Sequence, residues 1–155
     1  MPDRIRWQLT VPLEVSCMSR KDLFHDVVRK ALEQEGWLIT HDPYLVLFGE
    51  QKLQIDLAAE MPLAAEREGQ KIAVEIKSFV GESAITDLYN AIGQYLLYRT
   101  LIRKKEPERT LFLAVPYDTY EEMFDPAHGR DMRRDLGIQL IVYDVENERI
   151  SQWIP

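Results

Sequence analysis

One stretch decides the fold of this chain: Lys71-Ile-Ala-Val-Glu-Ile-Lys-Ser78. Apolar and charged side chains alternate along it, which predicts a β-strand. One face of this strand carries Ala73, Glu75 and Lys77. Burial of the two charged side chains in a sheet is costly unless they find partners. The apolar face consists of Ile72, Val74 and Ile76.

The strand before it carries a second carboxylate. Residues 53–58, Leu-Gln-Ile-Asp-Leu-Ala, repeat the alternation, with Gln54 and Asp56 on one face. On adjacent strands, Asp56 and Glu75 would form a two-carboxylate site with Lys77 beside it. Such oxygen ligands bind Mg²⁺ or Mn²⁺ and bring an activated water with the ion.

An ordinary surface ion pair is the competing interpretation. A cross-strand pair of Asp56 with Lys77 on a solvated sheet face is worth well under about 1 kcal/mol. Glu-x-Lys is common in ordinary strands, so spacing alone favours neither interpretation.

The length and composition indicate one globular domain. A chain of 155 residues can bury a full core. Its single cysteine, Cys17, excludes an internal disulfide and a zinc site built from several cysteines, and fits a reducing cytoplasm. No apolar run approaches the roughly 18–20 residues of a membrane span, so we expect a cytoplasmic protein with no membrane partner.

The net negative charge of the chain indicates which kinds of partner it can bind. The formal net charge is −7 and the pI is about 5.0. This counts against a protein that simply coats DNA, and less against a nuclease that gathers carboxylates for a metal. It also leaves room for a protein partner that supplies DNA contacts, and it leaves assembly of identical chains open.

Residues 1–17 differ from the rest of the chain in their mixed polarity and in the prolines Pro2 and Pro12. The alternation of Trp7 with the next apolar residues allows a short edge strand. The alternative is an extension ahead of a natural start at Met18. We divide the chain into an N-terminal extension, 1–17, and one domain, 18–155.

A helix is predicted from Ser19 or Asp22 to about Glu35. His25 lies at the flank of its apolar stripe, whereas Asp26 points towards water. His25 is therefore the candidate of this helix for the site. The alternative is a boundary histidine that bonds to backbone.

The longest helix is predicted from 81–83 to about Lys104. Asp87, Gln94 and Tyr98 line up along one edge of it, because they are spaced by 7 and 4. A basic cluster surrounds its end and suggests contacts to DNA phosphates, although cations also suit a helix C-terminus. The residues we assign to DNA contact are Arg99, Arg103 and Lys104.

The remaining elements complete an α/β domain with a central mixed sheet between helices. The strand at 111–115 follows a helix and should run parallel to the strand that carries Glu75. Glu60 and Glu66 fall in an expected connection, 60–69, as solvated loop charges or further metal ligands. Further strands are expected at 37–40, 44–48, 138–143 and 149–154, and short helices at 117–124 and 131–136.

The site residues resemble the PD-(D/E)xK nuclease superfamily, which has a three-layer restriction-endonuclease-like fold. The resemblance rests on Asp56, the Glu-x-Lys of Glu75 and Lys77, and the Gln-x-x-x-Tyr of Gln94 and Tyr98. It implies metal ligands at Asp56 and Glu75 and catalytic roles for all five residues. The helix before the sheet often adds a polar residue, a role that His25 would fill. Ile55 stands where the superfamily has proline.

A closer resemblance, to the XisH family, covers almost the whole chain from Met18 to Ile154. Members are named excision-controlling factors of the fdxN element, a cyanobacterial DNA element. The name implies a role beside a site-specific recombinase and a partner called XisI. Two hypotheses follow: a Mg²⁺-dependent DNA phosphodiesterase, or a non-catalytic regulator that binds DNA or XisI. The strings that carry the resemblance are Asp22–His25, Gly36–Pro43, Ala64–Glu66, Ile72–Phe79 and Gly93–Arg99.

Overall fold

A six-stranded mixed sheet forms the centre of the protein. The computed structural model describes residues 20–61 and 69–155. Its sheet has the strand order β1-β4-β5-β6-β7-β8, and β2 and β3 form a separate two-stranded ribbon. The strands are β1 (Leu38–His41), β2 (Tyr44–Phe48), β3 (Gln51–Ile55), β4 (Leu57–Met61), β5 (Gln70–Ile76), β6 (Arg109–Pro116), β7 (Leu140–Asp144) and β8 (Arg149–Ile154).

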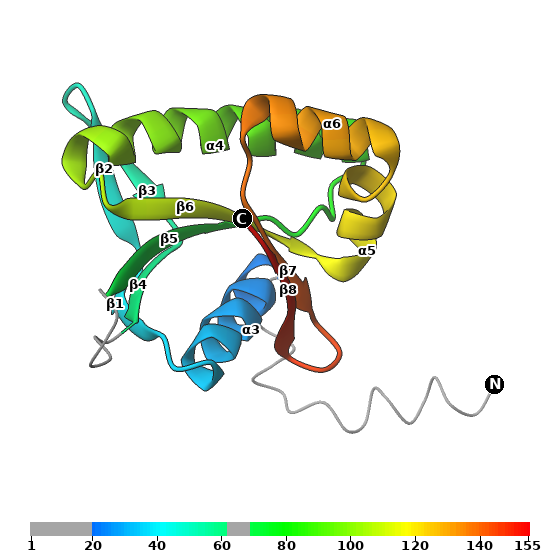
Figure 1. Cartoon of the computed structure of the whole chain (residues 1–155), viewed down its shortest axis with the longest axis horizontal. Helices are drawn as coiled ribbons and strands as arrows, with labels where there is room; N and C mark the ends of the chain where they lie inside the picture. The colour runs from blue at the N-terminus through cyan, green and yellow to red at the C-terminus, as the bar shows by residue number, and fades with distance from the viewer. Residues whose placement is uncertain (1–19, 62–68) are drawn as a thin grey trace.

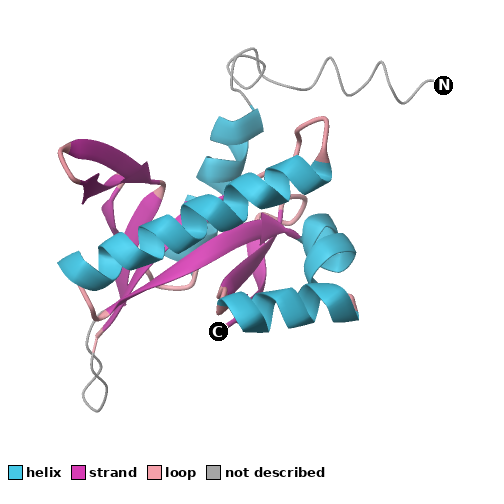
Figure 2. Ribbon diagram, turned by 90° about the horizontal axis from the view of Figure 1, so that it is seen from above, coloured by secondary structure: helices cyan, strands magenta, loops and turns pink. Residues whose placement is uncertain are grey.

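Helices cover both faces of the sheet, which gives the three layers expected from the sequence (Figure 1). Of the described helices, α3 packs against one face, and seen from above α4 lies across the strands of the other (Figure 2). None of the helices in the described ranges is long and apolar enough to cross a membrane. The helices are α3 (Arg20–Gln34), α4 (Ala84–Lys105), α5 (Tyr117–Thr119), the π-helical turn η1 (Tyr120–Phe124) and α6 (Ala127–Leu136).

Strand β5 distributes its side chains as the alternation predicts. Ala73 belongs to the apolar core under α4, and Glu75 points to the same face. β5 pairs antiparallel with β4 and parallel with β6, as the helical connection through α4 requires. The opposite face contributes Ile72, Val74 and Ile76 to the core under α3.

The prediction of one strand over 53–58 is wrong at Asp56. The chain bends there, so Ile55 ends β3 in the ribbon and Leu57 begins β4 in the main sheet. The Asp56 side chain accepts a hydrogen bond from the backbone N–H of Ile76, with a distance of 2.7 Å. This bond fixes the carboxylate beside the end of β5.

Other boundaries differ from expectation. Glu60 lies within β4 and interacts with Arg109 at 3.4 Å and Lys71 at 3.9 Å, so it is neither a loop charge nor close to the expected site. Glu66 and residues 1–17 lie outside the described ranges. Helix α6 begins at Ala127, four residues before the predicted start, because Pro126 precedes its first turn.

Substitution of two glycines, Gly129 and Gly93, would test how the helices pack. A Cβ at Gly129 would lie 2.0 Å from the carbonyl oxygen of Met123, because α6 crosses η1 there. Gly129→Ala should therefore lower the free energy of unfolding by about 1–3 kcal/mol. Gly93→Ala on the exposed side of α4 meets nothing within 4 Å and should raise it by about 1 kcal/mol. Urea unfolding of both variants measures these changes in the free energy of unfolding. Changes in the same direction for both variants would contradict the packing described.

Candidate functional site

The candidate site lies where β5 ends beside the Asp56 bend. Because β4 and β5 are antiparallel neighbours, with Leu57 opposite Val74, the residue before Leu57 lies next to Glu75. Lys77 follows β5 directly, and its backbone N–H bonds to Ala114 of β6. Three chain segments therefore fix the position of the two carboxylates and the lysine.

Glu75 is the buried member of this group. Its residue is only 6% exposed, and its Oε1 atom lies 3.6 Å from the Lys77 Nζ atom. Burial and the negative charge of Asp56 raise the pKa of Glu75 to about 8, against the opposing effect of Lys77. Within the described part of the chain, its Oε2 atom has no hydrogen-bond partner.

Helix α4 brings Gln94 and Tyr98 to the same region. The Gln94 Oε1 atom is buried and also lacks a hydrogen-bond partner among the described residues. Burial raises the pKa of Tyr98, and the charges of Glu75 and Asp56 add to the effect. The structure thus brings Asp56, Glu75 and Lys77 together, with Tyr98 near them, and Gln94 lies one helical turn before Tyr98 on the same edge of α4.

His25 joins the site from α3, on the other face of the sheet. Its Nδ1 atom lies 3.8 Å from Asp56 Oδ1, and its Nε2 atom is 2.9 Å from Asp42 Oδ1. The interactions with Asp56 and then Asp42 outweigh the effect of burial and raise the pKa of His25 to about 9. The imidazole therefore lies between two carboxylates that favour its protonated form, and within the described residues it has no hydrogen bond to backbone.

Asp42 and Arg29 form a support that the sequence analysis missed. Arg29 donates a hydrogen bond to Asp42, which is in contact with His25. The break at His41-Asp42-Pro43 and the family string Gly36–Pro43 cover this position. The break indicated a turn and carried no sign of which helix the aspartate would meet.

A small cavity opens beside this group. Its volume is about 120 Å³, large enough for several waters or a hydrated ion. The opening lies between the first half of α3 and the end of β5. Its lining residues are Asp22, Phe24, His25, Asp56, Ile76 and Ser78.

The basic residues predicted to contact DNA lie towards the other end of α4. Ten residues separate Gln94 from Lys104, which is about 15 Å of helix. Arg99 donates hydrogen bonds of 2.8 Å to the carbonyls of Leu136 and Gly137, so it closes the end of α6. Arg103 stays exposed on the surface.

The donor set fits a hard divalent cation such as Mg²⁺ or Mn²⁺. Asp56 and Glu75 offer carboxylate oxygens, and the repulsion between them would be relieved by a positive charge. The unpartnered oxygen of Glu75 is the acceptor that such an ion would satisfy. No three His, Cys, Asp or Glu side chains of the described ranges form a ready metal-binding group. A carbonyl such as that of Ile76 and waters would therefore have to complete the shell.

Together, the layers and this cluster define a class: a three-layer α/β domain of restriction-endonuclease-like architecture, with carboxylates and a lysine at the end of its central strands. A family model described as XisH protein matches residues 18–151. The chain belongs to the XisH family.

Two solved structures are similar to this chain. One is an XisH family protein from Nostoc punctiforme PCC 73102, and the other is an fdxN element excision controlling factor protein from Anabaena variabilis. Each is 44% identical, with a TM-score of 0.76, and the match covers 86% of this chain and 99% of the other. No curated protein matches the chain.

Proposed function

We propose that this chain acts in the excision of a DNA element, as a metal-dependent DNA phosphodiesterase of the PD-(D/E)xK type. The name of the Anabaena variabilis relative supports the excision role. One observation carries the phosphodiesterase: a buried Glu75 with an unpartnered oxygen, beside Asp56 and 3.6 Å from Lys77. A structural ion pair would satisfy that oxygen, because an unpartnered buried carboxylate oxygen is costly.

Asp56 and Glu75 would hold Mg²⁺ or Mn²⁺, with the Ile76 carbonyl as a third ligand. The ion, when bound, supplies Lewis acidity towards a phosphate oxygen and acidifies its water. Lys77 orients the attacking water and stabilises negative charge on the scissile phosphate. The charges of the two carboxylates, the divalent ion and the lysine add up to one net positive charge. This suits the binding of a phosphate.

Other residues around the site position the two carboxylates, Lys77 and the DNA. Gln94 offers its unpartnered oxygen to Lys77 or to the water. Tyr98 is only 8% exposed, so it would contact the DNA backbone with the small part of its side chain that reaches the surface. His25, fixed by Asp42, steadies the Asp56 carboxylate. Arg103 and Lys104 contact phosphates farther along the duplex, and Arg99 holds the end of α6 beside them.

Metal binding tests the first step. Calorimetric titration with Mg²⁺ and Mn²⁺ should show binding to the wild-type chain, weakened about a hundredfold in Asp56→Asn. The amide keeps an oxygen for the N–H of Ile76 but removes the charge that attracts the ion.

Asp135→Asn is the matched control for that titration. Asp135 is an exposed aspartate of α6, away from β5, so its removal should leave binding unchanged. Equal affinity of Asp56→Asn and wild type would remove Asp56 from the site. No binding to wild type, with or without DNA, would overturn the metal-dependent reading.

A non-catalytic regulator is the second candidate, and the surface of the β2–β3 ribbon favours it. Leu45 and Leu47, on one face of β2, are 42% and 58% exposed there, and Phe48 at the end of the strand is 57% exposed. An XisI-like protein could bind this apolar patch and recruit DNA. DNA binding without cleavage after addition of XisI would support this candidate over the enzyme.

A further inference from the structure

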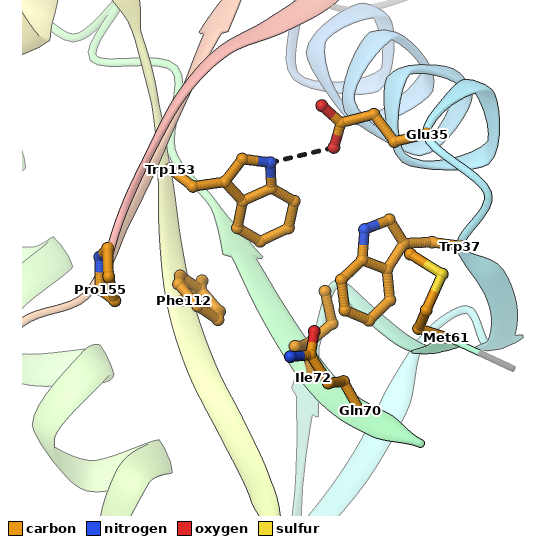
Figure 3. A pocket seen from close by; sticks show the side chains of 8 residues that line it. All are labelled: Glu35, Trp37, Met61, Gln70, Ile72, Phe112, Trp153 and Pro155. Atoms are coloured by element: carbon orange, nitrogen blue, oxygen red, sulfur yellow. Dashed lines mark hydrogen bonds between the residues drawn. The ribbon is translucent and has the colours of Figure 1, made fainter. Parts of the chain in front are cut away.

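A second pocket lies under α3 at the opposite end of β5, and aromatic rings form its floor (Figure 3). Trp37 and Trp153 stack with ring centroids 5.7 Å apart, and Phe112 meets Trp153 edge-on at 5.2 Å. The cavity holds about 570 Å³, a volume typical of sites for small ligands or side chains. Its other lining residues are Glu35, Met61, Gln70, Ile72 and Pro155.

The floor of this pocket is buried and aromatic, whereas its rim is exposed and mostly polar. Trp37 and Phe112 are buried, whereas Glu35, Gln70 and Pro155 are exposed at the opening. An entering group would therefore pass polar and charged atoms before it reaches the rings. This is the arrangement of a site in which the flat tip of an entering side chain lies against the rings and its stem passes the polar opening.

The pocket is separate from the carboxylate cluster. Gln70 begins β5 and Glu75 stands near its end, so the two sites are about 17 Å apart along the strand. An occupant here would leave the cluster open. The pocket therefore needs its own explanation, whichever function the cluster has.

Glu35 sets the charge of the opening. Its Oε2 atom accepts a 2.9 Å hydrogen bond from the Trp153 indole N–H, which holds that ring in place (Figure 3). Within residues 20–61 and 69–155, no lysine, arginine or histidine forms an ion pair with Glu35. Aromatic faces beside an uncompensated carboxylate attract a cation and repel a phosphate.

We propose that this pocket binds an arginine side chain of a basic protein partner. A guanidinium stacks on indole and pairs with a carboxylate, and its three-carbon stem can lie against the apolar side chain of Met61 in the wall. The net charge of −7 attracts a basic partner to the chain. Lysine fits less well, because its ammonium is more strongly hydrated and does not stack.

The test uses the full chain and two probes of the same shape, N-acetyl-arginine amide and N-acetyl-citrulline amide. The citrulline side chain replaces the guanidinium by an uncharged urea. Titration followed by the NMR signals of the Trp37 and Trp153 indole N–H groups should show at least about fivefold tighter binding of the arginine probe. Equal binding of both probes, or no shift of either signal, would overturn the proposal.

Glu35→Gln is the decisive variant. The amide oxygen can still accept the Trp153 bond, so the rings stay in place, but the charge is gone. The preference for arginine should fall to about twofold or less. Glu122→Gln removes an exposed negative charge on η1, in the other helical layer, and should keep the full preference. A preference that survives in Glu35→Gln would show that the carboxylate does not recognise the cation.

Discussion

Lys77→Ala is expected to lower DNA cleavage by about a thousandfold while metal binding stays within about twofold of wild type. The Lys77 Nζ atom lies 3.6 Å from Glu75 Oε1, and its side chain is 24% exposed, so it can reach both the carboxylate and an incoming phosphate. In the proposed mechanism it stabilises charge that develops only during cleavage. Its loss should therefore affect the rate much more than the affinity for the ion.

The assay measures nicking or linearisation of supercoiled plasmid by the full chain with Mn²⁺, with and without an XisI-like partner. Lys71→Ala is the matched control. Lys71 belongs to the same strand, but it lies near glutamates at the far end, Glu60 and Glu108 among them. Cleavage should survive in Lys71→Ala. If it also survives in Lys77→Ala, Lys77 has no part in the mechanism, and a wild type that binds metal and DNA without cleaving favours the regulator.

The parts of the site that follow from local periodicity could be predicted. A period of two placed Glu75 on the face opposite Ile76, and a helical period placed Gln94 and Tyr98 on one edge. The same geometry separated His25, which reaches Asp56, from Asp26, which points away and pairs with Lys30 at 2.9 Å. Each of these inferences needs only the backbone path of one element.

The parts that depend on distant segments could not be predicted. Asp42 reaches His25 only because the turn after β1 lies against α3, and no pattern within either segment indicates the meeting. Arg99 belonged by spacing to the basic cluster, yet α6 packs so that its last carbonyls meet the guanidinium. In both cases the partner comes from a contact between layers, which periodicity does not encode.

The contacts of Arg109 also join distant segments, so the sequence pattern did not predict them. Replacement of Arg109 should have the largest effect on stability. Its side chain is 1% exposed at the start of β6. It donates hydrogen bonds of 2.8 Å to the Ile72 carbonyl and of 3.2 and 3.1 Å to Glu106. Tyr44 also donates to Glu106, and its ring lies 5.0 Å from the guanidinium. One buried cation thus joins three strands and the end of α4.

Arg109→Met should lower the free energy of unfolding by about 3–5 kcal/mol, because Glu106 loses its buried cation and the Ile72 carbonyl loses its donor. Burial alone would raise the pKa of Glu106, but hydrogen bonds from Tyr44 and Arg109 outweigh it and hold that pKa below its ordinary value. Losing the arginine removes part of this stabilisation of the charged form.

Urea unfolding measures the loss, with Arg103→Met as the control. Arg103 is exposed on α4, so the same substitution there should change the free energy by at most about 0.5 kcal/mol. Glu106→Gln in the Arg109→Met background should cost much less than it does in wild type, because the two residues act on each other. A loss below about 1 kcal/mol for Arg109→Met would show that the apolar side chain compensates for the ion pair, as happens at some buried salt bridges.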